Sequence, residues 1–278
     1  MFKRISALCL IVVMLMALGL AGCQSGAGNT TASTGAADNS LQKIKDKGEL
    51  VLGLDDAFPP MGFRDDKNEI VGFDIDLAKE VCKRMGITLK LQPVEWSQIV
   101  NELNAGQIDC IWNGYSITPS RQTETNITDP YMKNHQVVVV LADSSYKTLA
   151  DLAGKTLTLQ AESSASDALE KAADFKASLK EVVELDDNVM AMQDLDAKAS
   201  DAILLDEIVA NYYIKNKDAK YRILDETLAD EDYGVGFRKA DQTLRDEVEK
   251  TLKAMAADGT MAKISETWFG KDITTIGK

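Results

Sequence analysis

The chain has 278 residues and a formal charge of −13, from 31 basic and 44 acidic side chains. This acidic balance excludes a protein whose main partner is the phosphate backbone of a nucleic acid, because such a partner requires clustered Lys and Arg. The length allows one large or two medium domains, since domains commonly hold about 100–200 residues.

The N-terminus has the organisation of a bacterial export signal, which we assign to residues 1–22. Lys3 and Arg4 form a short basic region, and an uncharged apolar stretch follows over residues 5–20. This stretch is short for a membrane span, which needs roughly 20 residues, so we expect cleavage. The small residues before Cys23 resemble the lipobox of bacterial lipoproteins, in which that cysteine is lipidated and becomes the first residue.

Residues 23–40 are expected to form a flexible tether. The segment is rich in Gly, Ala, Ser, Thr and Asn and has almost no large apolar side chain, so it cannot bury a core. We therefore expect a protein anchored to the cell membrane by lipid, with a folded body on the extracytoplasmic face.

Segments typical of strands then alternate with segments typical of helices. The strand patterns cover residues 50–54, 89–94, 108 onward, 137–141, 156–160, 182–183, 202–205 and 233–237. The helical patterns cover residues 73–85, a helix capped by Ser97 and closed at Gly106, helices from Ser164 and Asn188, and two helices within residues 244–268. Strands separated by helices indicate βαβ units and hence an α/β fold with mostly parallel sheets.

Two such series predict two lobes, each with a mostly parallel sheet flanked by helices. We assign residues 41–132 to lobe 1 and residues 133–229 to lobe 2, with residues 230–278 returning to lobe 1 and ending in a tail. The chain would cross between the lobes twice, near residues 131–136 and 229–233, forming a hinge. Because ligands of open α/β sheets bind at the C-terminal ends of strands, the cleft between the lobes is the expected site.

Arg121 ends the most informative segment, IDCIWNGYSITPSR. A guanidinium at the C-terminal end of a strand, beside hydroxyl groups, suits bidentate capture of a small carboxylate. A solvated surface charge is the alternative. Asp55, Phe58 and Trp96 also follow predicted strands. The alternative for Asp55 is a turn-forming carboxylate, and that for Phe58 is a core-filling ring.

Two segments of lobe 2 complete the predicted cleft. Residues 160–166 join a strand to a helix, whose first backbone N–H groups favour an anion. Capping of that helix by Ser163 is the alternative and is compatible with anion binding. Asp206 ends an apolar strand, where helix capping is again the alternative.

At these residues the chain resembles the amino-acid-binding proteins of ABC importers, which have the type II periplasmic-binding-protein fold. The resemblance covers nearly all of residues 41–270. Its segments occur in order as FPPMGF, VGFDIDLAKEV, GYSITPSR, TDPY, DAILLDE, YGVGF and ETWFG.

The resemblance implies a role for each matching residue. Arg121 would grip the ligand α-carboxylate, with hydrogen bonds from Ser116 and the backbone of Ser164. Asp206 would take the α-ammonium, helped by the carbonyl of Gly114 and the hydroxyl of Ser116. Both charges of a buried zwitterion need partners, because desolvating either alone costs several kcal/mol.

The ligand side chain would lie between Phe58 and Trp96, with its polar end against Asp55 and Gln160. Further expected contacts are Asn113 and Ser163. Glu162 departs from the family, which often has glycine there, and the role of Trp112 stays open between core and ligand contact. Asp55 and Glu162 favour a neutral polar or basic amino acid over an acidic one.

No cofactor or metal is expected. The single histidine, His135, and the lack of a CxxC pair argue against zinc. Residues 153–156 resemble the end of a P-loop, but Leu149 occupies the position of its first glycine. Cys82 and Cys110 remain open between a disulfide and two buried thiols.

The expected function is therefore that of a monomeric receptor without catalysis, which delivers an amino acid to the membrane permease subunits of an ABC importer. Two alternatives share the fold. One is a dehydratase acting on prephenate or arogenate, and the other is a sensor module that passes ligand binding to a signalling partner.

Overall fold

The computed structural model describes residues 38–216 and 220–278. The signal peptide, Cys23 and most of the tether lie outside these residues. Within the described part of the chain, no helix combines the length and the apolar character needed to cross a membrane.

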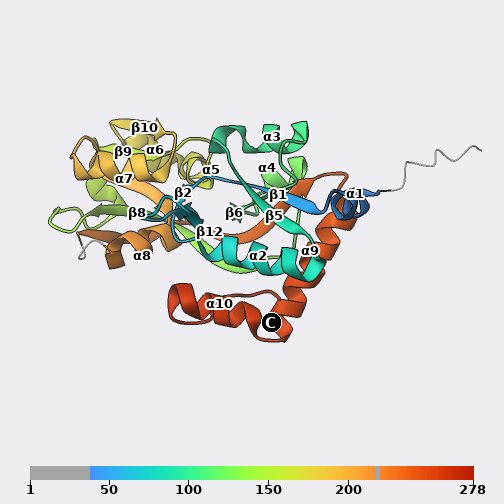
Figure 1. The fold of residues 1–278 in the computed structure, drawn as a ribbon. Helices are drawn as coiled ribbons and strands as arrows, with labels where there is room; N and C mark the ends of the chain where they lie inside the picture. The colour runs from blue at the N-terminus through green and yellow to red at the C-terminus, as the bar shows by residue number, and fades with distance from the viewer. Residues whose placement is uncertain (1–37, 217–219) are drawn as a thin grey trace, which may run out of the picture. The chain divides into compact units, whose positions relative to one another are not determined.

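A nine-stranded sheet organises the fold, in the order β10-β9-β11-β8-β12-β6-β1-β5, with β7 pairing beside β12 (Figure 1). Its strands are β1 (Glu49–Leu54), β5 (Thr88–Pro93), β6 (Cys110–Ser116), β7 (Thr125–Ile127), β8 (Met132–Leu141), β9 (Thr156–Gln160), β10 (Glu181–Leu185), β11 (Ala202–Asp206) and β12 (Tyr221–Arg238). A three-stranded sheet, β2 (Ala57–Phe58), β3 (Gly62–Arg64) and β4 (Ile70–Val71), follows β1.

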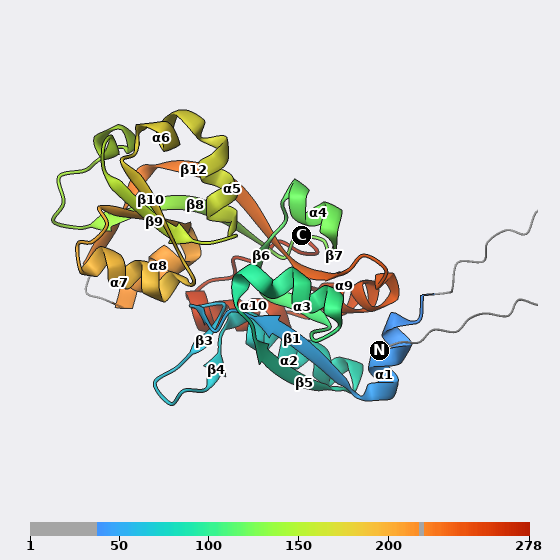
Figure 2. The same ribbon diagram turned by 90° about the horizontal axis from the view of Figure 1, so that it is seen from above.

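The sheet is parallel at its two ends and antiparallel in the middle. β1 pairs in parallel with β5 and β6, which we call lobe 1, and β9 pairs in parallel with β10 and β11, which we call lobe 2. β8 and β12 are antiparallel to each other, from Met132 opposite Tyr233 to Leu141 opposite Tyr221. Figure 2 shows this pair running from one lobe to the other. The two predicted crossings are thus neighbouring strands of one ladder, and the predicted α/β fold class is confirmed.

The helices that flank the sheets are, with the short 3₁₀ turns, α1 (Ser40–Lys47), α2 (Phe73–Met85), η1 (Trp96–Gln98), α3 (Ile99–Ala105), α4 (Pro119–Glu124), η2 (Leu149–Leu152), α5 (Ser164–Lys171), α6 (Ala173–Ser178), α7 (Asn188–Asp196), α8 (Glu207–Asn216), α9 (Gln242–Ala257) and α10 (Thr260–Phe269). α2 has its predicted bounds because its apolar side chains recur on one buried face and Gly86 ends it in the left-handed conformation. The predicted cap at Ser97 is wrong. The chain there forms η1, closed by the Gln98 N–H donating to the Glu95 carbonyl at 2.9 Å, and α3 begins at Ile99.

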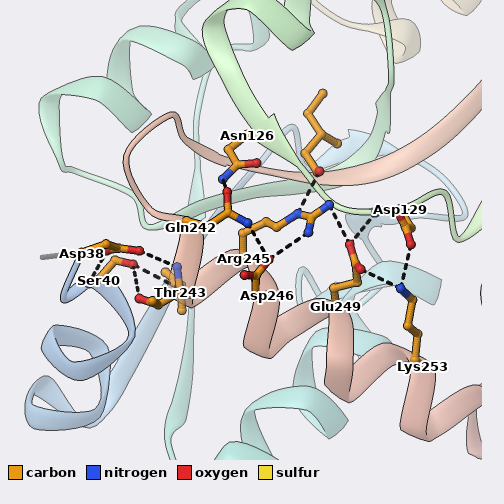
Figure 3. Close-up of polar contacts among 12 residues, drawn as sticks. Asp38, Ser40, Asn126, Asp129, Gln242, Thr243, Arg245, Asp246, Glu249 and Lys253 are labelled. Atoms are coloured by element: carbon orange, nitrogen blue, oxygen red, sulfur yellow. Dashed lines mark hydrogen bonds and ion pairs between the residues drawn. The ribbon is translucent and has the colours of Figure 1, made fainter.

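α9, from the C-terminal part of the chain, holds the N-terminal helix in place (Figure 3). α1 begins at Ser40, the last residue assigned to the tether, and the Ser40 hydroxyl lies 3.0 Å from the Thr243 hydroxyl. Asp38 accepts a hydrogen bond from the backbone N–H of Thr243. The folded body therefore includes Asp38 and Ser40, which lie at the end of the predicted tether, residues 23–40.

The same helix anchors the segment that leads into the hinge strand β8. Glu249 accepts a hydrogen bond from the Asp129 N–H at 2.8 Å, and Lys253 lies 2.7 Å from carboxylate oxygens of both Asp129 and Glu249 (Figure 3). α9 therefore fixes one end of the hinge to lobe 1.

Cys82 and Cys110 are free thiols, both buried. Burial raises the pKa of Cys82 to about 12, so this thiol stays protonated and unreactive. Both cysteines are therefore residues of the hydrophobic core.

Candidate functional site

A small cavity lies between the lobes, where strands of both end. Its nine lining residues were all predicted from the sequence: Phe58, Trp96, Asn113, Gly114, Arg121, Gln160, Ser163, Ser164 and Asp206. The other two predicted residues lie directly behind this lining. Asp55 accepts a hydrogen bond from Gln160 at 2.7 Å, and the Ser116 hydroxyl lies 3.1 Å from that of Ser164.

Arg121 lines the cavity and is buried, with only 9% of its surface exposed. Its guanidinium carbon lies 4.5 Å from the centroid of the Tyr115 ring and 5.4 Å from that of Trp96, and Nη1 donates to the Ser116 carbonyl at 3.2 Å. No described carboxylate forms an ion pair with it. The alternative of a solvated charge is therefore wrong. Stacking on two rings orients the planar group, so that it can bind a carboxylate in bidentate fashion.

The N-terminus of α5 lines the same cavity. Ser163 occupies the capping position, but its hydroxyl donates to the Gln160 carbonyl at 2.7 Å and accepts no helix N–H. The predicted cap is therefore present in position but not as a hydrogen bond. The first N–H groups of α5 are left for another acceptor, and the helix end is positive, so both features favour an anion near Arg121.

Asp206 is buried in the same cavity lining. It accepts hydrogen bonds from Asn134 Nδ2 at 2.7 Å and from the hydroxyl of Tyr233. These bonds run to the hinge strands β8 and β12, and among the described residues no helix N–H donates to Asp206. Burial raises the pKa of Asp206, and the nearby carboxylate of Glu231 raises it further. Burial disfavours the ionised form of Asp206, and a cation bound beside it would stabilise that form.

A direct hydrogen bond between the lobes marks a third part of the site. The Asp55 carboxylate accepts from Gln160 Nε2 at 2.7 Å and from the Ala57 N–H at 2.8 Å. Burial, with smaller contributions from the charges of Asp187 and Asp56, raises its pKa to about 6. This part of the site therefore holds a buried carboxylate.

Gly114 is required where β6 meets the loop that carries Phe58. A methyl group at this position would lie 2.7 Å from Cε1 of the Phe58 ring, and the backbone has a φ of +59°. Only glycine meets both conditions without strain. Its absence of a side chain lets the Phe58 ring reach the cavity wall.

The structure assigns the two residues that the sequence left open. Trp112 is fully buried, and its ring centroid lies 6.5 Å from that of Tyr131, so it is a core residue. Glu162 has a φ of +55°, the left-handed conformation that glycine adopts without strain. Glu162 lines the mouth of the cleft, a second hollow that contains further acidic residues: Glu124, Asp167, Glu170 and Glu184.

Sequence reasoning missed a carboxylate that supports the site from behind. Asp74 is fully buried and accepts hydrogen bonds from the Gly114 N–H at 2.7 Å and the Tyr131 hydroxyl at 2.9 Å. Burial raises its pKa to about 7. Its signals were its place in the family segment VGFDIDLAKEV and its position as an acidic residue on the buried face of a predicted helix, but neither indicated a role in the site.

Side chains of the hinge strands were missed as well. Glu231 on β12, with Asn134 and Gln136 on β8, forms a network that reaches Asp206 and Ser116. Nothing in their local sequence distinguishes them, because the antiparallel pairing of β8 with β12 brings them together.

Comparison with known proteins identifies the family. The model of the bacterial extracellular solute-binding proteins, family 3, matches residues 50–271. The chain belongs to this family. Among its relatives, the L-cystine-binding protein TcyJ of Escherichia coli strain K12 is 28% identical over 86% of this chain and 89% of its own length. ABC transporter arginine-binding protein 1 of the same strain is 31% identical over 80% of this chain and 90% of its own.

A solved structure of a family relative has the same architecture. It is an ABC uptake transporter substrate-binding protein from Streptococcus pneumoniae with bound histidine. It superposes with a TM-score of 0.83 at 36% identity, covering 87% of this chain and 100% of that protein. The two-lobed fold of this solute-binding protein is therefore shared along nearly the whole described body.

Proposed function

We propose that this chain is the substrate-binding component of an ABC importer and binds a polar or basic L-amino acid in the cleft between its lobes. The arrangement of charge in the cavity supports this most directly. A buried guanidinium, a helix N-terminus and the buried carboxylate of Asp206 all contribute to one cavity lining. An amino acid carries the complementary charges on one carbon, so it would neutralise both.

The second part of the proposal concerns the side chain of the ligand. Asp55 and Glu162 make this part of the cleft and its mouth acidic, which disfavours an acidic ligand and favours a neutral polar or cationic one. The relatives named above bind cystine, arginine and histidine, none of which carries a net negative charge at neutral pH.

Ligand binding would be coupled to closure of the lobes. Arg121, Gly114 and Phe58 belong to lobe 1, whereas Ser164 and Asp206 belong to lobe 2. A ligand that contacts both sets stabilises the closed arrangement, because only that arrangement supplies all of its partners. The permease would then recognise the closed protein.

We also propose that the mature protein is a monomer, lipidated at Cys23 and held at the outer face of the membrane. Residues 1–22 would be removed, and the glycine- and serine-rich segment that follows would let the body reach the permease. Mass spectrometry of the exported protein should find a diacylglyceryl-modified N-terminal cysteine, and a Cys23→Ala variant should be released from membranes.

A thermal-shift screen of the L-amino acids and L-cystine tests the function. We expect stabilisation by at least one polar or basic member, and loss of that stabilisation in Arg121→Ala and in Asp206→Ala. Each change removes one partner of a buried charge, which typically weakens binding by about 2–5 kcal/mol. Calorimetric titration then gives the affinities. If both variants bind as tightly as the wild type, the pairing of both ligand charges is wrong.

The dehydratase and sensor alternatives make different predictions. A dehydratase would convert prephenate or arogenate to an aromatic product, which absorbance detects directly. A sensor would co-purify with a signalling partner rather than with permease subunits. We expect no product and association with a permease.

A further inference from the structure

Glu231 lies on β12 at the point where this strand crosses between the lobes. Its Oε2 atom accepts hydrogen bonds from the Ser116 hydroxyl at 2.9 Å and from the side-chain amides of Asn134 and Gln136, both at 3.1 Å. Ser116 lies directly behind the cavity lining, 3.1 Å from the Ser164 hydroxyl. Glu231 therefore stands behind the lining of the ligand site and is connected to it from the hinge by hydrogen bonds, through a side chain that no family motif marks.

Glu231 and Asp206 share one hydrogen-bond donor. Asn134 Nδ2 lies 2.7 Å from Asp206 Oδ1 and 3.1 Å from Glu231 Oε2. The separation between Asp206 Oδ1 and Glu231 Oε2 therefore cannot exceed the sum of these two distances. Two carboxylates so close, with Asp206 buried, repel each other strongly when both are ionised.

The groups around Asp206 and Glu231 supply little positive charge. The charged and titratable groups that act on Asp206 are Glu231, the hydroxyl of Tyr233 and, at longer range, Arg121. On β8 the adjacent His135 does not join the network, because it pairs with Asp230 and Glu207. The group that would satisfy the pair is a cation.

Gln136 adds a further acceptor. Its side chain is fully buried, and its amide nitrogen donates to Ser164 Oγ at 3.2 Å and to Glu231, while Oε1 has no hydrogen-bond partner. Together with the two carboxylates, this oxygen makes three acceptors within one network. An ammonium group has three N–H donors.

We propose that Glu231 is a second carboxylate of the subsite that takes the ligand α-ammonium, and that binding displaces a proton held by the neighbouring Asp206. This inference rests on the proposed function and adds a residue and a proton to it. Asp206 holds this proton until the ammonium replaces it, and the proton passes to the buffer. Affinity should therefore rise with pH until Asp206 is fully ionised.

Calorimetry tests the proposal with L-arginine and L-glutamine as probes, from about pH 5 to pH 8 in pairs of buffers with different ionisation enthalpies. We expect the wild type to release a fraction of a proton near neutral pH. Glu231→Gln should release less, because it removes a charge that favours the proton on Asp206, and should therefore lose part of the pH dependence. It should also bind about tenfold more weakly at the upper end of the range.

Two variants control for folding and for general charge. Asp232→Asn removes a negative charge from the neighbouring residue of β12, which lines a separate surface hollow with Lys239 and Arg245. We expect it to behave as the wild type. Glu231→Asp keeps the carboxylate, so it should retain proton release even if shortening lowers the affinity.

A probe without the ammonium group separates recognition from structural support. 5-Guanidinopentanoic acid is arginine without its α-amino group, and we expect its affinity to be the same for the wild type and for Glu231→Gln. Equal weakening of this acid and of L-arginine would mean that Glu231 only supports the hinge, and unchanged proton release in Glu231→Gln would also overturn the proposal. If the wild type binds neither amino acid nor any other in the screen, the proposed function itself fails, which is a distinct result.

Discussion

The carboxylate-binding and ammonium-binding parts of the cleft are built in different ways. Arg121 is held by two aromatic rings and one backbone carbonyl and has no ion-pair partner among the described residues. Asp206 instead lies in a network of amides and hydroxyls beside a second carboxylate. The cation is oriented by apolar surfaces, whereas the anions are oriented by hydrogen bonds.

This difference follows from the chemistry of the two groups. A guanidinium is planar and weakly hydrated, so aromatic rings can hold it without removing its donors from a ligand. A carboxylate has no such face and needs donors to remain ionised in a buried place. Both arrangements keep a charge poised for a ligand, at a cost in folding free energy that the ligand offsets.

Substitution of Arg121 should have the largest effect on ligand binding. Arg121→Lys keeps the positive charge but loses the planar group that stacks on Tyr115 and Trp96 and that can make two parallel bonds to a carboxylate. We expect affinity for the best amino acid in the screen to fall by about 100-fold. Calorimetric titration measures it. Wild-type affinity in this variant would mean that charge alone, and not the oriented plane, binds the carboxylate.

In the ammonium-binding part of the cleft, Asp206→Asn should raise the stability of the protein while weakening ligand binding. Because burial raises the pKa of Asp206 in the folded protein above the usual value of 3.8, its ionisation opposes folding as pH rises from about 4 through neutrality. The amide cannot ionise but can still accept from Asn134 and Tyr233 through its oxygen. Without added amino acid, the variant should gain about 1–3 kcal/mol over the wild type at about pH 8 and little at about pH 4.

Denaturant unfolding at these two pH values measures that difference, and calorimetry on the same samples should show weaker binding. A variant that is less stable than the wild type at the higher pH would show that the Asp206 carboxylate is already fully compensated by its hydrogen bonds.

The smallest effect is expected at the mouth of the cleft. Glu162→Gly relieves a left-handed backbone conformation that costs a side-chain-bearing residue about 1–2 kcal/mol, although glycine also gains entropy when unfolded. We expect a net stabilisation of up to about 1 kcal/mol in denaturant unfolding. Loss of one acidic charge at the mouth should slow association of a cationic amino acid slightly and leave a neutral one unaffected.

The residues that line the cavity could be predicted from the sequence because they lie near the C-terminal ends of recognisable strands or just after them. Periodicity marked the strands, and parallel strands that feed helices place their C-terminal ends at one edge. Asp55, Arg121, Gln160 and Asp206 were found in this way, with the family resemblance supplying their roles. Short apolar strands and glycine-ended helices such as α2 were also predicted with nearly correct bounds.

Residues whose importance depends on pairing between distant segments could not be predicted. Glu231 and Asn134 are nearly a hundred positions apart and meet only because β8 and β12 form one antiparallel ladder. In the sequence, Asp74 is one residue of a predicted amphipathic helix. Its place behind the site follows only from its contact with Gly114 in the folded protein. The capping position of Ser163 was predicted, but the direction of its hydrogen bond depends on the local backbone of the folded loop.

By itself, the sequence determined the α/β class, the order of strands and helices and the set of side chains at the strand ends, because these depend on local periodicity and on the chirality of βα units. Only the tertiary structure decided which charges are buried, which are paired and which carboxylates stand together. Those properties depend on desolvation and on distances of a few ångströms between segments far apart in the chain, and local sequence carries no record of either.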